Sequence, residues 1–178
     1  MRQTVAVFGA SRSRPGQPGY EAGVRCGRLL ARAGFAVATG GYAGMMEAVA
    51  RGATEAGGIA VGVTAPSVFL DRATANEFIT EERPASSLTL RIAELVEATD
   101  ASITLWGSIG TATELLVAWN VAYVAQFSQI ERKPVIAVGH PWTTVIPALE
   151  RDLATEPGIV TVTATVDDAV DELIRQLS

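Results

Sequence analysis

Runs of β-branched residues alternate with longer amphipathic segments along the whole chain. This alternation is typical of a parallel β-sheet that is covered by helices on both faces. The buried runs predict six strands, over residues 4–8, 35–38, 59–63, 101–105, 134–138 and 159–163. The amphipathic segments predict helices over residues 20–33, 45–56, 87–99, 111–127, 142–154 and 167–176. We therefore expect one α/β domain over residues 1–178, with three layers in the order helix, sheet, helix.

One connection breaks the alternation. From residue 64 to residue 87 the sequence contains two prolines and a Glu-Glu-Arg run, and only residues 77–80 suggest a short edge strand. Connections of this length inside a compact domain often form lids or substrate-binding loops. This one can equally be a surface excursion with no part in binding.

The composition fits one domain with an ordinary core, because the 178 residues are 48% hydrophobic and 19% charged. A formal net charge of −5 argues against a nucleic-acid backbone or an anionic membrane as the main partner. No apolar run is long enough to span a bilayer. Cys26 is the only cysteine, so no intramolecular disulfide can form, and we expect a cytoplasmic protein.

The composition also argues against several kinds of catalytic site. His140 is the only histidine, which leaves it at most a lone acid or base and disfavours a metal cluster or a Ser-His-Asp triad. Lys133 is the only lysine and directly precedes Pro134, a poor place for a Schiff-base or P-loop lysine. The loop after the first strand lacks the G-x-G-x-x-G pattern of dinucleotide-binding folds. We therefore expect no metal and no cofactor.

The sequence from residue 105 to residue 120, LWGSIGTATELLVAWN, combines a strand end, a glycine-rich turn and a helix start. Gly107 and Gly110 allow a sharp bend, with Ser108 and Ile109 between them. Thr111 can cap the helix that follows, and Glu114 then lies in its first turn. The backbone N–H groups of such a turn favour a phosphate or another anion. The structural alternative is that the helix dipole alone favours an acidic residue there, by about 0.3 to 1 kcal/mol.

The loop after the first strand, GASRSRPGQPG, is a second candidate contact region. Its small residues Gly9 and Ser11 let a ligand come close, and Arg14 is available as a charged contact for an anion. The alternative is a solvated loop with exposed arginines.

A further glycine-rich turn follows the second strand. Its three glycines precede the next helix: Gly40, Gly41 and Gly44. They predict a second anion-binding turn at a helix start. Glu47 in the first turn of that helix is either a dipole partner or a second active-site carboxylate, and Met46 beside it is expected to pack in the core.

The helix expected over residues 111–127 is apolar on nearly every side. One sheet cannot cover all faces of such a helix. A partner subunit is the simplest cover for the remainder, so we expect a homodimer or a higher homo-oligomer.

Two segments, TGGYAGMMEAVARGA and LRIAELVEATDASITLWGSIGTATEL, resemble the LOG (lonely guy) family, whose members are often labelled lysine decarboxylase-like. The resemblance implies a Rossmann-like, doubly wound fold for the chain. It also implies hydrolysis of cytokinin riboside 5′-monophosphates to a free base and ribose 5-phosphate. In that family a P-G-G-x-G-T-x-x-E motif binds phosphate and supplies a catalytic glutamate, and an arginine on the preceding helix completes the site.

The motif residues match at several positions, among them Glu114 for the glutamate and Arg91 for the arginine. Trp106 and Ser108 stand where the family has Pro and Gly, and Ile92 stands where the phosphoribohydrolases usually carry a basic residue. The wider superfamily also contains nucleotide sensors and a molybdenum-cofactor carrier. The decarboxylase label fits poorly with a single lysine.

These observations lead to one hypothesis and two alternatives. The hypothesis is hydrolysis of the N-glycosidic bond of a nucleoside 5′-monophosphate, in which Glu114 stabilises the sugar cation or activates water and Arg91 holds the phosphate or ribose. The first alternative is a non-catalytic binding or carrier protein for a nucleotide or a phosphorylated pterin (molybdenum) cofactor. The second is a structural homodimer in which Arg91 merely pairs with Glu94 or Glu97 at the surface.

Overall fold

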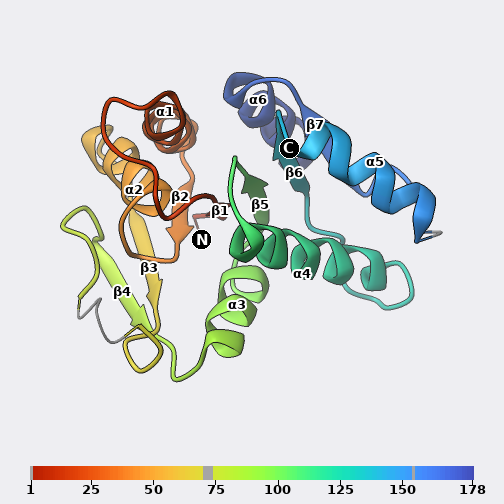
Figure 1. Cartoon of the computed structure of the whole chain (residues 1–178), viewed down its shortest axis with the longest axis horizontal. Coiled ribbons are helices and arrows are strands. Elements are labelled where there is room, and N and C mark those ends of the chain that lie inside the picture. The colour runs from red at the N-terminus through yellow and green to blue at the C-terminus, as the bar shows by residue number, and fades with distance from the viewer. Residues whose placement is uncertain (1, 70–73, 154) are drawn as a thin grey trace.

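The computed structural model describes residues 2–69, 74–153 and 155–178 (Figure 1). Its strands are β1 (Thr4–Phe8), β2 (Ala36–Thr39), β3 (Ala60–Thr64), β4 (Glu81–Pro84), β5 (Ala101–Thr104), β6 (Val135–Val138) and β7 (Val160–Thr163). Its helices are α1 (Pro18–Arg32), α2 (Met45–Glu55), α3 (Leu88–Glu97), α4 (Ile109–Ala125), α5 (Trp142–Asp152) and α6 (Val166–Leu177). The α/β architecture expected from the sequence is therefore confirmed.

All described strands pair in parallel in one sheet of order β4-β3-β2-β1-β5-β6-β7. The chain starts at the centre with β1, moves outward to β4 and returns to the other side of β1 with β5. The loops after β1 and β5 therefore leave the sheet side by side and in opposite directions. In open α/β sheets this switch point is where ligands bind, beyond the carboxyl ends of the strands.

Two hydrophobic clusters fill the space between the sheet and its helices. One joins the sheet to α1, α2 and α6, and the other joins its opposite face to α3, α4 and α5. Figure 1 shows α1 and α2 side by side, away from α3 and α4. Cys26 is fully buried in the first cluster, as its place on an amphipathic helix predicts.

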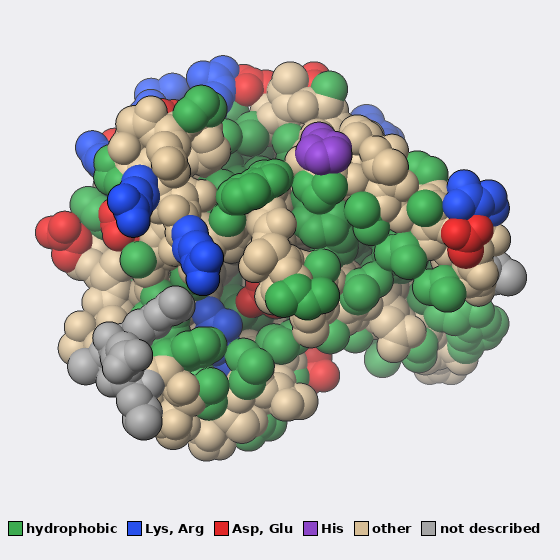
Figure 2. Space-filling view, viewed as in Figure 1, with side chains coloured by type: hydrophobic (Ala, Val, Ile, Leu, Met, Phe, Trp, Pro, Cys, Tyr) green, Lys and Arg blue, Asp and Glu red, His purple; other side chains and the backbone are tan. Residues whose placement is uncertain are grey.

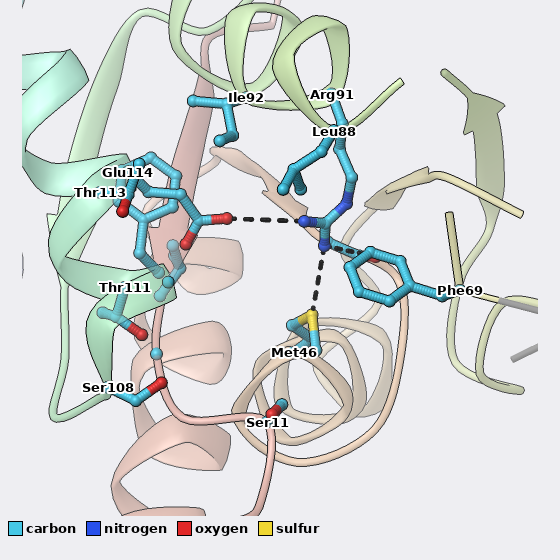
Figure 3. A pocket seen from close by; sticks show the side chains of 15 residues that line it. Ser11, Met46, Phe69, Leu88, Arg91, Ile92, Ser108, Thr111, Thr113 and Glu114 are labelled. Atoms are coloured by element: carbon cyan, nitrogen blue, oxygen red, sulfur yellow. Dashed lines mark hydrogen bonds and ion pairs between the residues drawn. The ribbon is translucent and has the colours of Figure 1, made fainter. Parts of the chain in front are cut away.

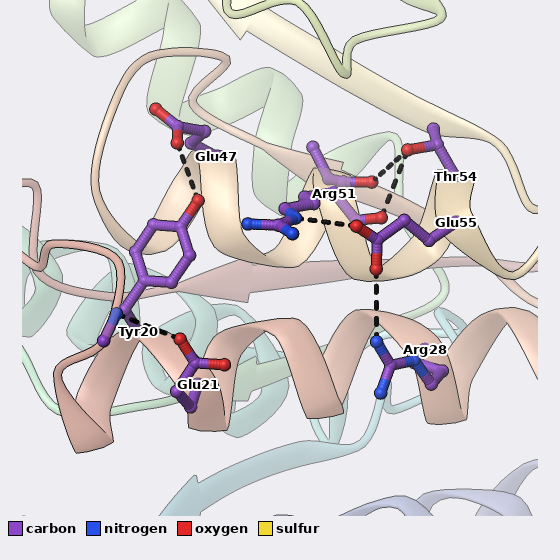
Figure 4. A network of polar contacts seen from close by, with 9 residues as sticks. Tyr20, Glu21, Arg28, Glu47, Arg51, Thr54 and Glu55 are labelled. Atoms are coloured by element: carbon purple, nitrogen blue, oxygen red, sulfur yellow. Dashed lines mark hydrogen bonds and ion pairs between the residues drawn. The ribbon is translucent and has the colours of Figure 1, made fainter.

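Helices α1 and α2 pack closely because small residues face each other across their contact. A Cβ atom on Gly27 would overlap Val49 O, and one on Gly52 would overlap Val24 O. Charged residues border this contact, with Glu55 accepting hydrogen bonds from Arg28 and Arg51 (Figure 4).

The first turns of the same two helices are joined by Tyr20, whose hydroxyl donates to Glu47 Oε1 at 2.6 Å (Figure 4). Burial and then this hydrogen bond raise the pKa of Tyr20 to about 12, so the hydroxyl keeps its proton. Glu47 therefore has a structural partner on α1.

The expected edge strand at residues 77–80 is wrong, since the edge strand β4 is Glu81–Pro84. Residues 76–79 form a turn instead, closed by a hydrogen bond from Ile79 N to Asn76 O. Strand β4 is charged and largely exposed, which is how sheet edges avoid pairing with other chains. A search for buried β-branched runs overlooks such a strand.

None of the described helices is long and apolar enough to cross a bilayer.

Candidate functional site

A cavity of about 260 Å³ opens at the switch point, beyond the carboxyl ends of β1 and β5. Figure 2 shows a hollow on this face in which acidic and basic side chains lie among hydrophobic ones. The cavity is lined by Val7, Phe8, Gly9, Ser11, Gly40, Met46, Phe69, Leu88, Arg91, Ile92, Ser108, Gly110, Thr111, Thr113 and Glu114. Its wall thus combines both strand ends, the start of α4, and one face of α3.

The start of α4 forms one end of the cavity (Figure 3). Ser108 is the N-cap, and within the described chain its hydroxyl makes no capping hydrogen bond. The α4 hydrogen-bond ladder begins with Ala112 N to Ser108 O, so the N–H groups of the three preceding residues lie ahead of it. A Cβ atom on Gly110 would meet nothing within 4 Å, so this turn is open to a ligand. Such an end of a helix attracts anions.

Two details of the expected motif are wrong. Helix α4 begins at Ile109 and is capped by Ser108, whereas Thr111 is buried with its side chain against Gly107. Glu114 therefore lies in the second turn of α4 and not in the first. The dipole explanation for Glu114 loses its basis, because that effect is confined to the first turn.

Arg91 is buried between α3 and the turn after β2, with only 5% of its surface exposed. Its Nε donates to Val63 O at 2.7 Å and its Nη2 donates to Gly40 O at 3.0 Å. Nη2 also lies 3.6 Å from Met46 Sδ. A surface ion pair with Glu94 or Glu97 is therefore wrong for Arg91, whose guanidinium is held by backbone carbonyls at the cavity wall.

Glu114 faces Arg91 across the cavity, with 3.7 Å between Arg91 Nη1 and Glu114 Oε1 (Figure 3). The two side chains are 7% and 14% exposed, so the pair is shielded from water. Burial raises the pKa of Glu114 to about 7, although the charge of Arg91 acts in the opposite direction. A carboxyl group with a pKa near neutrality can both take up and release a proton at cellular pH.

The other end of the cavity is apolar. Leu88 and Ile92 point into it on the α3 side of the Arg91–Glu114 pair, and Phe69 lies beside the Arg91 guanidinium (Figure 3). The Phe69 ring packs edge-on against Tyr42, and its centroid lies 5.7 Å from Arg91 Cζ. This wall suits a flat or hydrophobic group more than a charged one.

The cavity brings together most of the residues singled out from the sequence. They are Gly9, Ser11, Gly40, Arg91, Ser108, Gly110, Thr111 and Glu114. Five others do not line it: Arg14, Gly41, Gly44, Gly107 and Ile109. Their surroundings differ, because Ile109 is 82% exposed while Gly41 and Gly44 are packed closely against neighbouring atoms. A Cβ on Gly44 would lie 2.5 Å from the Ser11 backbone, so the loop after β1 already covers the start of α2.

Several cavity residues were not expected from the sequence. Phe69 comes from the long connection after β3, so part of that connection borders the cavity, while its residues 70–73 lie outside the described chain. Met46 is buried as expected, yet it also contacts Arg91. Leu88 and Ile92 follow a helical hydrophobic pattern that does not distinguish core from cavity. His140 is exposed and does not line the cavity.

The described residues contain no group of three or more His, Cys, Asp or Glu side chains that could hold a metal ion.

The raised pKa of Glu114 predicts a pH-dependent stability. Between its ordinary value of 4.5 and about 7, the folded protein holds a proton that the unfolded chain has released. The unfolding free energy should therefore fall as pH rises through this range, by roughly 3 kcal/mol from this group. Denaturant unfolding at pH 5 and pH 8 measures the change. The Glu114→Gln variant should lose that part of the slope, and equal slopes in both proteins would contradict the prediction.

Two curated rice proteins are similar in sequence to this chain. The chain is 33% identical over 118 residues to "Probable cytokinin riboside 5'-monophosphate phosphoribohydrolase LOGL9" of Oryza sativa subsp. japonica, covering 65% of the chain and 52% of the relative. It is 38% identical over 117 residues to LOGL5 of the same organism, which bears the same enzyme name, covering 64% and 45%. The chain thus spans about half the length of these curated relatives.

Among solved structures, the molybdenum cofactor binding protein from Rippkaea orientalis superimposes with a TM-score of 0.80 and 18% identity, over 100% of this chain and 99% of that one. This likeness shows that the fold is shared. The model of the SLOG cluster4 family matches residues 2–164, nearly the whole chain. The resemblance of the two glycine-rich segments to the LOG family is thereby confirmed, and the protein belongs to the SLOG cluster4 family.

Proposed function

We propose that the protein hydrolyses the N-glycosidic bond of a nucleoside 5′-monophosphate, giving a free base and ribose 5-phosphate. The observation that carries the proposal is the order of three regions along one cavity. The start of α4, whose N–H groups favour an anion, comes first, the Arg91–Glu114 pair lies in the middle, and apolar side chains of α3 lie at the far end. A nucleotide has its phosphate, glycosidic bond and base in the same order.

Cleavage of this bond develops positive charge on the sugar ring as the base leaves. The Glu114 carboxylate, facing the middle of the cavity, is placed to stabilise that charge or to take a proton from the attacking water. The water oxygen then bonds to the anomeric carbon and keeps its other proton as the new hydroxyl group. As the C–N bond breaks, the base leaves with the bonding electron pair and takes on its ring nitrogen the proton that Glu114 received, which restores the carboxylate. Arg91 holds Glu114 in place and contributes a positive charge for the phosphate or ribose.

The names of the rice relatives support this assignment, because they describe a hydrolase acting on nucleoside 5′-monophosphates. The chain aligns with about half of each relative, so the substrate is argued from the cavity of this protein. The apolar wall makes a purine base, with or without an N6 substituent, the best fit.

Release of ribose 5-phosphate tests the proposal. We expect turnover of AMP and of N6-isopentenyl-AMP, and much weaker turnover of adenosine, which lacks the phosphate that the start of α4 would hold. Cleavage of adenosine at the same kcat/KM as AMP would contradict the role of the helix start. Failure to cleave either nucleotide would overturn the enzyme assignment.

A carrier of a nucleotide or a phosphorylated pterin is the second candidate. It is favoured by Trp106 and Ser108, which alter the phosphate-binding motif while Glu114 is kept. A carrier should bind its phosphorylated ligand, and be stabilised by it against heat, without releasing ribose 5-phosphate.

We further propose that the active form is a homodimer or a larger homo-oligomer that covers the outer face of α4. Within its bounds α4 has a single charged residue, Glu114, and that residue faces the cavity. Several large apolar side chains around α4 and α5 are exposed: Leu116, Val124, Phe127, Ile130 and Leu153. Leu116 and Leu153 also border a groove of about 280 Å³ between the two helices.

Sedimentation should therefore show a mass of at least two chains, and Val124→Glu should shift it toward one chain. Leu90→Glu is the matched control, since Leu90 is similarly exposed but lies on α3. A monomeric wild type, or equal effects of both variants, would refute the assignment of this face.

A further inference from the structure

The connection after β3 contacts the turn after β2 through Asn76. The Asn76 backbone N–H donates to Gly41 O at 2.8 Å. Its side-chain Nδ2 donates to Gly41 O at 3.0 Å and to Tyr42 O at 2.8 Å. Its Oδ1 accepts from Phe78 N at 3.1 Å, so the amide orientation is set by partners on both sides. Asn76 thus holds two consecutive carbonyls of the turn after β2.

The same turn holds Arg91. The carbonyl just before those two, Gly40 O, accepts from Arg91 Nη2, and the Tyr42 ring centroid lies 5.7 Å from Arg91 Cζ. Gly40 has no room for a side chain, because a Cβ there would overlap the guanidinium of Arg91. Any movement of the turn therefore moves the surface against which Arg91 rests.

Other contacts hold different parts of this turn. Gly41 adopts a φ of +76°, in the left-handed region that costs glycine little, and Gly41 N donates to Thr39 Oγ1 at 3.1 Å. The Tyr42 hydroxyl accepts from Ala65 N at 2.8 Å, which fixes the ring but not the carbonyls. The hydrogen bonds from Asn76 hold the carbonyls of Gly41 and Tyr42 directly.

We propose that Asn76 is a positioning residue for Arg91: it orients the Gly40–Tyr42 turn so that the guanidinium stays aligned with Glu114. This inference rests on the proposed function for its effect on rate, and on the structure alone for its effect on Arg91. Asn76 does not line the cavity, so it would act on a bound substrate only through Arg91. Its loss should therefore act on the chemical step more than on binding of the phosphate.

Two substitutions of Asn76 and one control distinguish the positioning of Arg91 from a general loss of folding stability. Asn76→Ala removes both side-chain donors and the acceptor. Asn76→Asp keeps an acceptor for Phe78 N but removes both side-chain donors, while the backbone bond from Asn76 N–H to Gly41 O remains. Thr80→Val is the control, because Thr80 Oγ1 also bonds twice to the backbone, but at Ala60 and away from Arg91.

With AMP as substrate, both Asn76 variants should lower kcat by about tenfold to 100-fold and change KM by less than about twofold, since a misplacement of about 1 Å can cost 10²-fold in rate. Thr80→Val should leave kcat within about twofold of wild type, even if its melting temperature falls. Wild-type kcat in folded Asn76→Asp would overturn the proposal.

An NMR measurement tests the positioning of Arg91 without any substrate turnover. Arg91 Nε–H, buried and donating to Val63 O, should give a slowly exchanging ¹H–¹⁵N signal, which is assigned by its loss in Arg91→Lys. In both Asn76 variants this signal should shift and exchange faster, and in Thr80→Val it should not. An unchanged signal in both Asn76 variants would overturn the positioning role, whereas a wild type that cleaves no nucleotide would overturn only the proposed function.

Discussion

Replacement of Glu114 by glutamine is expected to lower kcat for nucleotide hydrolysis by about 10² to 10⁴, the usual contribution of a general base. The amide has nearly the same shape as the carboxyl group, so packing in the cavity should be kept. It carries no negative charge for the sugar cation and takes no proton from water. Rates of ribose 5-phosphate release from AMP, together with AMP affinity from calorimetry, distinguish lost chemistry from lost binding.

Glu47→Gln is the matched control for this experiment. Glu47 also lies near the start of a helix that faces the switch point, but its Oε1 accepts a hydrogen bond from Tyr20 and it does not line the cavity. An amide oxygen can accept the same bond, so this variant should retain nearly all activity. Equal losses in both variants, or full activity in Glu114→Gln, would remove Glu114 from the mechanism.

Replacement of Arg91 by methionine is expected to lower kcat/KM by at least about 30-fold, since truncating one partner of a buried charge pair costs about 2 to 5 kcal/mol. The variant leaves Val63 O and Gly40 O without their guanidinium donors, so stability should fall as well. It also removes the charge that lowers the pKa of Glu114, which should therefore rise above about 7. The part of the pH profile in which kcat/KM increases with pH should therefore move to higher pH.

Arg83→Met tests whether loss of any arginine has these effects. Arg83 lies on β4, where it is exposed and pairs with Glu81 and Glu94, so its removal should change neither the rate nor the pH profile. If the pH profile of Arg91→Met matches that of the wild type, the titrating group that limits the rate is not coupled to Arg91. The assignment of Glu114 as the base would then fail.

The helices and most strands could be predicted from the sequence because their hydrophobic periods reflect burial on one face or on both. The failures have local causes. Strand β4 is an exposed edge, so its residues are charged and carry no burial signal. Ser108 and Thr111 are both plausible caps, and the choice between them depends on how the chain leaves β5. The helical pattern of α3 does not indicate that Arg91 is buried, as it is in the structure.

Part of the candidate site could be predicted from the sequence: the glycine-rich turn before α4 indicated Glu114, and the resemblance to the LOG family indicated Arg91. Phe69 and Met46 could not be predicted as cavity residues. Phe69 lies near Arg91 and packs against Tyr42, although it belongs to the connection after β3. Such contacts join segments far apart in sequence, and no periodicity records them.

The resemblance to the LOG family indicated Arg91 and Glu114 as candidate site residues. By itself, the sequence determined the α/β class, the alternation of strands and helices, and the acidic charge. These follow from local composition and from side-chain spacing, which act over a few residues. The tertiary structure alone decided that Arg91 lies buried against the carbonyls of Gly40 and Val63, and that Glu114 faces it at 3.7 Å. The physical reason is that desolvation and ion pairing depend on three-dimensional proximity, which arises only when the two halves of the sheet meet at β1 and β5.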